Sequence, residues 1–142
     1  MNSFSSFLSL SAVIVLLFSG CSTPYQGSGL RGGYDESQLS KDTWRVTFTG
    51  NAATSEQRAV DFTLLRCAEL AKSEGFPFFI LQDEASSVDS RTWGTDGNMH
   101  SANFPRVSNL MQGFKTRPMD VNKVVYEVDY LIPSLKEKYD LE

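Results

Sequence analysis

The chain has very few of the residues that build metal sites and disulfide frameworks. Its 142 residues include one histidine and two cysteines, and its 17 acidic residues outnumber its 13 basic ones. A zinc site needs several His or Cys ligands, so we expect no metal site and no cofactor. Proteins that bind nucleic acid select basic patches, and the net charge of −4 therefore argues against a nucleic-acid partner.

Long apolar runs are also missing. The longest, residues 7–18, has 12 residues, whereas a helix that crosses a bilayer needs about 20. A short apolar run followed by small residues is typical of a secretion signal. Phe18-Ser19-Gly20-Cys21 resembles the bacterial lipobox, in which the cysteine thiol is acylated and the chain is cut just before it. We therefore predict a signal peptide over residues 1–20 and membrane lipid bound through an acylated Cys21.

The residue after this cysteine bears on location. It is Ser22 and not aspartate, and its resemblance to the sorting pattern of Gram-negative lipoproteins favours the outer membrane, on the periplasmic side. An ordinary signal peptide and an uncleaved anchor are the alternatives. With Cys21 acylated, Cys67 is the one remaining thiol, which excludes an intramolecular disulfide. Because Cys67 lies in an apolar helical pattern, we expect it to be buried and inert.

The rest of the chain reads as a linker and one domain. Residues 21–40 hold the lipidated cysteine and a Gly- and Ser-rich stretch that predicts a flexible tether. Residues 41–142 are enough for one core. Alternation predicts a strand over residues 43–50, and a helix is expected from about Ser55 to residue 74. The apolar run over residues 78–82 predicts a strand buried on both faces, which completes a βαβ unit.

The C-terminal half gives weaker signals. Residues 84–105 are polar and predict a long irregular loop, in which Asp96-Gly97 suggests a tight turn or hairpin tip. Strands are expected over residues 106–115 and, from strong alternation, over residues 123–132, with a short helix after Pro133. The predicted class is α+β: the βαβ unit plus C-terminal antiparallel strands, with one long helix packed on a small mixed sheet.

One stretch resembles a known family. Over residues 32–79 the chain is similar to a family of small, uncharacterised bacterial lipoproteins. The matching positions are Gly33, Tyr34, Glu36, Leu39, Trp44, Arg45, Val46, Phe48, Gly50, Asn51, Thr54, Ser55, Arg58, Asp61, Leu64, Leu65 and Arg66. The family has no established activity, so the resemblance supports the predicted location and fold and implies no chemistry.

Two groups of side chains are candidates for function. Aromatic residues flanked by arginines are typical of contact surfaces, and five residues in or beside the predicted loop therefore form a candidate binding site. They are Arg91, Trp93, His100, Phe104 and Arg106. Three carboxylates, Asp83, Glu84 and Asp89, could instead serve acid–base chemistry on glycans. We therefore expect a non-enzymatic lipoprotein that binds an envelope protein or cell-wall component, with an envelope enzyme acting on glycans as the alternative.

Overall fold

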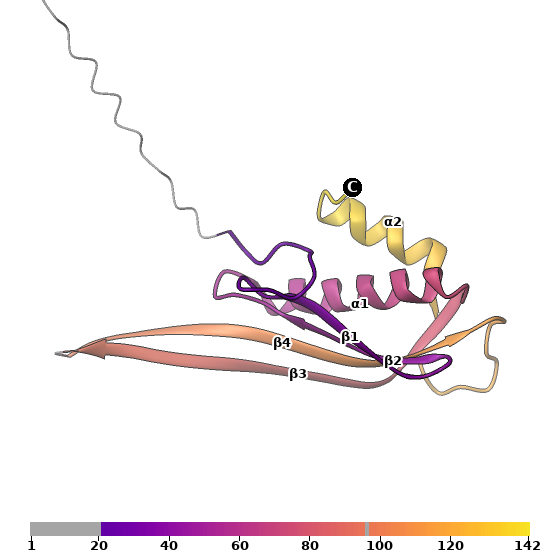
Figure 1. Ribbon diagram of the computed structural model, residues 1–142, viewed down its shortest axis with the longest axis horizontal. Helices are drawn as coiled ribbons and strands as arrows, with labels where there is room; N and C mark the ends of the chain where they lie inside the picture. Colours follow the sequence, from indigo (N-terminus) through magenta and orange to yellow (C-terminus); the bar gives the residue numbers. More distant parts are fainter. Residues whose placement is uncertain (1–20, 96) are drawn as a thin grey trace, which may run out of the picture.

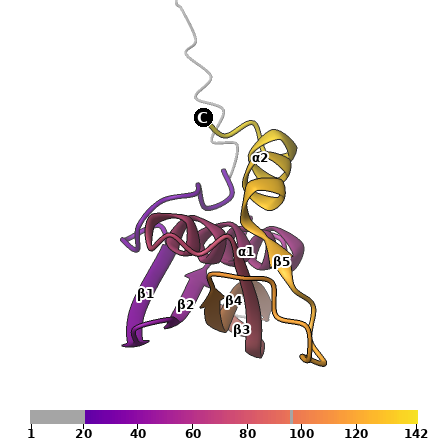
Figure 2. The same cartoon turned by 90° about the vertical axis from the view of Figure 1, so that its right-hand side faces the viewer.

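The computed structural model describes residues 21–95 and 97–142, so the predicted signal peptide over residues 1–20 lies outside the described part. The chain forms strands β1 (Gly33–Ser40) and β2 (Thr43–Thr49), helix α1 (Glu56–Ser73), strands β3 (Phe78–Thr95), β4 (Asn98–Phe114) and β5 (Tyr126–Glu127), and helix α2 (Val128–Lys138). Helix α1 lies across one face of the sheet, and α2 lies on the side of α1 that faces away from the sheet (Figures 1 and 2). Within the described residues, no helix has the length and apolar character that a membrane crossing requires.

Helix α1 begins and ends where the sequence predicts. Ser55 is its N-cap, and the hydroxyl oxygen of Ser55 accepts a hydrogen bond from the backbone N–H of Arg58 at 3.1 Å. Glu74 is the C-cap, and Gly75 follows with a φ of 75°, a backbone conformation that residues with a Cβ rarely adopt. Between these two signals the helix contains three alanines and no glycine or proline, a composition that favours the helical conformation.

The core lies between α1 and the inner face of the sheet. Alternate residues of β2 are buried, namely Trp44, Val46 and Phe48, as the alternating pattern of that strand requires. Cys67 lies fully buried among these apolar side chains, and burial raises the pKa of its thiol. The expectation of a buried thiol is therefore confirmed, and its protonated form suits a packing role.

The α+β class, with one long helix on a small sheet, is confirmed, but the sheet differs in one respect. The strand order is β1-β2-β4-β3-β5, and every neighbouring pair of these strands is antiparallel. The βαβ unit places β2 and β3 in the same direction, as expected, but β4 lies between them. The sheet is therefore antiparallel and not mixed, because the hairpin from β3 returns into the gap beside β2.

The prediction of a long irregular loop over residues 84–105 is wrong. These residues form the outer parts of β3 and β4, which pair continuously from Phe78↔Phe114 to Thr95↔Asn98. The suggested hairpin tip is confirmed, because Thr95↔Asn98 is the last pair and Gly97 is in a turn; Asp96 lies outside the described residues. Aspartate, asparagine and glycine recur in this segment and are depleted in strands, and the outer hairpin extends into solvent, so the segment has no alternating apolar pattern that would predict a strand.

The strand predicted over residues 123–132 is also largely wrong, because only Tyr126–Glu127 is a strand and helix α2 follows at once. Val128, Leu131, Ile132 and Leu135 have the i, i+3, i+4, i+7 spacing of a helix face, and they pack toward α1. The apolar residues of this segment therefore fit both the two-residue period of a strand and the 3.6-residue period of a helix. Pro133 lies inside α2 and does not begin it.

Part of the segment expected to be a flexible linker is structured. Residues 33–40 form β1, which pairs with β2 from Gly33↔Thr49 to Ser40↔Thr43. Strand β1 is at the edge of the sheet and mostly exposed, which explains its polar composition. Before it, residues 26–34 double back in a tight turn that requires Gly32, since a Cβ there would lie 2.2 Å from the Thr49 carbonyl oxygen.

Candidate functional site

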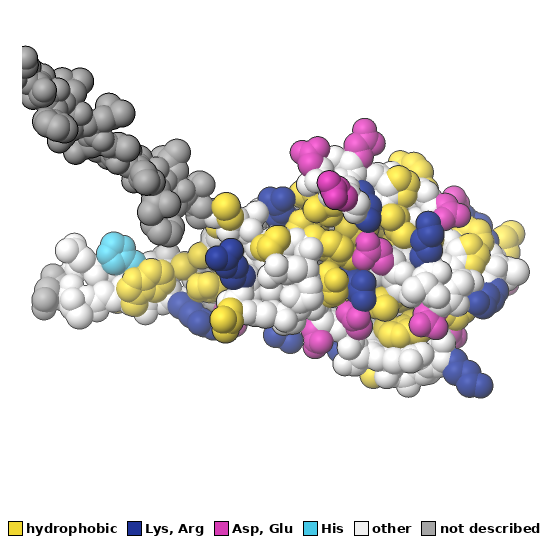
Figure 3. All heavy atoms as spheres, turned by 45° about the horizontal axis from the view of Figure 1, so that its top comes forward, with side chains coloured by type: hydrophobic (Ala, Val, Ile, Leu, Met, Phe, Trp, Pro, Cys, Tyr) yellow, Lys and Arg dark blue, Asp and Glu magenta, His cyan; other side chains and the backbone are white. Residues whose placement is uncertain are grey.

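The most prominent feature of the molecule is the end of the β3–β4 hairpin. Strand β2 pairs with β4 only as far as Arg106, so residues 88–95 and 98–105 continue as a two-stranded ribbon, which we call the arm. The arm projects well beyond the body of the molecule (Figure 1). In the space-filling view the one histidine lies far out on it (Figure 3).

All five residues of the predicted binding site lie on one face of this hairpin. Arg91, Trp93, His100 and Phe104 lie in the arm, and Arg106 lies at its base. Trp93 pairs with His100, and residues two apart on a strand share a face. This face points away from α1, because the alternate residues of β4, beginning with Val107, are buried toward the helix. The sequence predicted the residues but not the ribbon that aligns them.

The aromatic rings and guanidinium groups of this face contact one another. The rings of Trp93 and His100 are stacked, with centroids 6.2 Å apart and 28° between their planes. The Arg91 guanidinium lies 5.0 Å from the centroid of the Phe104 ring. Trp93 is 54% exposed, so it does not fold back onto the core. The result is a solvent-facing strip of π systems and cations, which we call the aromatic face.

A hollow lies where the arm joins the body. Arg91 and Phe104 line it together with the turn over residues 28–32, the last residue of β2 and the two residues after it, and its volume is about 300 Å³. Leu30 is fully exposed at the tip of that turn. The hollow extends the aromatic face toward the N-terminal segment, whose composition predicts a linker.

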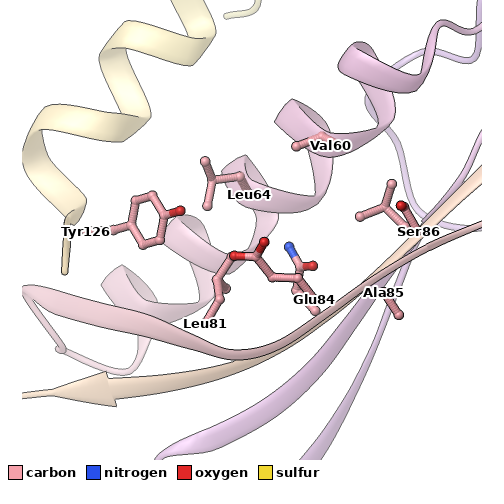
Figure 4. A pocket seen from close by; sticks show the side chains of 9 residues that line it. Val60, Leu64, Leu81, Glu84, Ala85, Ser86 and Tyr126 are labelled. Atoms are coloured by element: carbon pink, nitrogen blue, oxygen red, sulfur yellow. The ribbon is translucent and has the colours of Figure 1, made fainter. Parts of the chain in front are cut away.

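A second pocket, of about 210 Å³, lies between α1 and the hairpin and was not predicted (Figure 4). Glu84 points toward α1 into this pocket, and Leu64 and Tyr126 lie near its carboxylate in the same view. Burial, together with the negative charge of Glu84, raises the pKa of Tyr126. The pocket forms where the register of β3 shifts at Gln82 and the strand turns away from α1, and no sequence signal marks such a shift.

The three carboxylates considered for glycan chemistry do not converge. Glu84 pairs with Asn109, which is buried toward α1, whereas the preceding residue, Asp83, projects from the opposite face of the sheet. Asp89 lies farther along β3, opposite Phe104, on the aromatic face. Acid–base catalysis on a glycan needs two carboxyl groups facing one cleft. Adjacent residues of one strand cannot supply that arrangement.

The predicted lipidation site lies against the body. Cys21 is exposed, and its carbonyl oxygen accepts a hydrogen bond from Asn51 Nδ2 at 2.9 Å. Two residues on, Thr23 is fully buried; its hydroxyl donates to the Arg31 carbonyl oxygen and accepts from the Asn51 backbone N–H, at 2.9 and 2.7 Å. The Ser22 hydroxyl accepts a hydrogen bond from Arg58. The cysteine is therefore fixed beside the start of α1.

A charged network holds the following residues to α1. The Arg66 guanidinium bonds to Glu36 at 2.7 Å and lies 4.5 Å from the centroid of the Tyr34 ring. The Tyr25 hydroxyl donates to Glu69, and its ring packs edge-on against Phe62. Arg66 also forms an ion pair with Glu69, at 3.4 Å. These contacts make residues 21–40 a part of the domain.

No family model, curated protein or solved structure matches the chain. Among the described residues, no three His, Cys, Asp or Glu side chains come together as metal ligands would. The site is therefore defined by its own geometry: an exposed aromatic face on an arm, and an exposed cysteine fixed to the body at the start of α1.

Proposed function

We propose that the chain is a lipid-anchored lipoprotein of the bacterial envelope, held at the periplasmic side of the outer membrane by an acylated Cys21. In this proposal it is a non-enzymatic binding module, and the aromatic face of the arm contacts an envelope protein or a cell-wall component. The observation that carries the proposal is that the aromatic face is exposed on an arm that extends beyond the core of the domain.

The position of Cys21 supports the anchor. Cys21 is exposed, so an acyl group on its sulfur does not clash with the domain. Because Thr23 is buried two residues later, the body would stay within a few residues of the bilayer surface. Each methylene that enters the bilayer contributes about 0.8 kcal/mol, and stable anchoring takes two or more signals. The two or three acyl chains typical of bacterial lipoproteins meet that requirement.

The composition of the arm supports a binding role. Exposed aromatic side chains are hydrated unfavourably, and a cluster of them on a protein surface is typical of a site that a partner covers. Trp93 stays exposed, with His100 as its stacking partner, and no core residue depends on it. Arg91 and Arg106 flank the aromatic rings on the same face. This arrangement suits a partner that offers flat rings or carboxylates.

Metabolic labelling tests the anchor. Cells that express the chain are grown with an alkyne fatty acid, and the expected result is label on the wild-type protein and none on Cys21→Ser. Cys67→Ala is the matched control, because it removes the other cysteine, which is buried, and should keep the label. Label that persists on Cys21→Ser contradicts the proposal.

Photocross-linking in intact cells tests the arm. A benzoylphenylalanine in place of Trp93 should give adducts with an envelope component, identified by mass spectrometry. The control position is Lys41, which is exposed in the turn between β1 and β2. Adducts of equal yield at both positions, or at neither, would contradict a binding role for the aromatic face.

A further inference from the structure

The outer edge of β3 has no partner over most of its length. Strand β5 pairs only with Phe78 and Phe79, and no other strand in the described residues lies on that side of β3. Next to β5, residues 122–124 lie near residues 81–84 of β3, and the Gln82 carbonyl oxygen accepts a hydrogen bond from Lys123 Nζ at 3.2 Å. From Ala85 to Thr95 every second residue presents its backbone N–H and C=O to solvent. Such an edge is a template for a further strand.

The edge also lacks most of the devices that block pairing. Residues 84–95 contain no proline and no lysine, and small side chains predominate among them. Natural sheets protect a long exposed edge with short strands, lysines or prolines at the edge. Residues 85–95 of β3 have neither lysine nor proline, and their two charged side chains, Asp89 and Arg91, are opposite in sign, which suits pairing with another strand.

We propose that this strand is β3 of a second copy of the chain, paired antiparallel along the same edge with Ser90 at the two-fold axis. In that register Asp89 of each copy lies directly opposite Arg91 of the other. Directly opposite residues in an antiparallel pair share a face, so two ion pairs form across the junction.

Charge complementarity selects this register. A symmetric pair keeps odd residues opposite odd ones, so the axis falls on a residue. An axis on Asp89 places two aspartates together, and an axis on Arg91 places two arginines together, which costs free energy. An axis on Val88 or Thr92 gives neither charge an opposite partner. Only the axis on Ser90 pairs both.

Both charged groups are free to take part. Neither Asp89 nor Arg91 forms an ion pair with any residue in the described part of the chain. Arg91 lies over the Phe104 ring, 5.0 Å from its centroid, and a guanidinium that contacts a ring can also bond a carboxylate through its N–H groups. The aromatic face remains open, because the copies join through strand edges and not through that face.

The symmetry agrees with the proposed anchor. A two-fold axis perpendicular to the sheet keeps α1 of both copies on the same side of the joined sheet. Cys21 lies on that side, since the Arg58 of α1 bonds to the next residue, Ser22. Both cysteines then face one bilayer, and confinement there raises the effective concentration of the partners. This agreement rests on the proposed function, whereas the strand pairing does not.

Cysteine cross-linking tests the register in cell membranes. Ser90→Cys places two thiols at the axis, where opposite Cα atoms in an antiparallel pair are about 4.5–5.5 Å apart and a disulfide can form. We expect a reducible dimer on a non-reducing gel. Thr92→Cys is the matched control, because its two copies are offset by about 13 Å along the strands. The wild-type chain gives the background from Cys21 and Cys67.

A charge exchange tests the pairing by a second route. Asp89→Lys should weaken self-association about tenfold in analytical ultracentrifugation, because two attractive pairs become repulsive ones. Adding Arg91→Asp to it should restore the dimer. Circular dichroism checks that each variant folds.

Several results would overturn the inference. They are a monomer at all concentrations, equal cross-linking through residues 90 and 92, or a Ser90→Cys adduct with a different protein. If the wild-type chain takes up no fatty-acid label, the proposed anchor is wrong but the strand pairing is unaffected. The two failures are therefore distinguishable.

Discussion

Thr23→Val tests whether the N-terminal segment is part of the domain. Valine has nearly the same shape as threonine but lacks the hydroxyl group. In the structure that hydroxyl serves two backbone groups, the carbonyl of Arg31 and the N–H of Asn51, in a fully buried position. If residues 21–34 were a free linker, the substitution would have no effect on stability.

The magnitude follows from the groups left without a partner. The Asn51 N–H keeps a second, longer contact of 3.2 Å to Thr54 Oγ1, so most of the cost falls on the Arg31 carbonyl. A buried polar group that loses its partner costs about 1–3 kcal/mol. We expect the free energy of unfolding to fall by about 2 kcal/mol, which corresponds to a Tm lower by about 8 °C in a domain of this size.

Urea unfolding followed by circular dichroism measures this change. The midpoint should fall with an unchanged slope, since the surface exposed on unfolding is nearly the same. Thr116→Val is the control: this threonine is exposed in the segment after β4, and its replacement should change stability by less than about 0.5 kcal/mol. Equal midpoints for Thr23→Val and wild type would refute the docked segment.

Three further predictions concern the body and the arm. Phe62→Ala should cost about 3–5 kcal/mol in urea unfolding, because this fully buried ring packs against aromatic rings on three sides; a cost below 1 kcal/mol would contradict that packing. Burial alone would raise the pKa of Asp61, but hydrogen bonds, the first of them from Lys138, outweigh it and hold the pKa below its usual value. The stability that wild type has over Asp61→Asn should therefore be constant above about pH 5 and shrink as the pH falls below about 4, and a loss on raising the pH would oppose this account. Trp93→Ser should leave the urea midpoint unchanged. It should also abolish the cross-linked adducts in cells when the photoreactive residue stands at a neighbouring position of the arm. A large loss of stability would instead show that the Trp93 ring stabilises the fold.

The parts of the fold that sequence could predict are those with one consistent local signal. Strand β2 alternates strictly, and α1 has a capping serine at one end and Gly75 at the other. Burial on one face of each element agrees with these local signals. The direction of β3 relative to β2 also followed from the short connections.

The parts that failed depend on tertiary contacts. The residues of α2 alternate as a strand would, and only packing against α1 selects the helical period. The arm has no buried face, so its polar strands carry no apolar alternation to detect. Residues 26–34 look like a linker because their order comes from glycines, from hydrogen bonds within the segment and from the contact of Tyr34 with Arg66 of α1, which is distant in sequence.

The candidate site was predicted in its residues and not in its arrangement. Aromatic and arginine residues in a polar stretch pointed to a contact surface, but the shared face requires the register of β3 and β4. The pocket beside Glu84 and Tyr126 depends on a register shift that has no sequence signature. Position on a strand pair, and not residue type, decides which side chains act together.

Intact mass spectrometry of the protein extracted from membranes tests the central claim most directly. The account predicts a mature chain that begins at Cys21 and carries a diacylglyceryl group on its sulfur. A chain that begins at any other residue, or an unmodified Cys21, would contradict it.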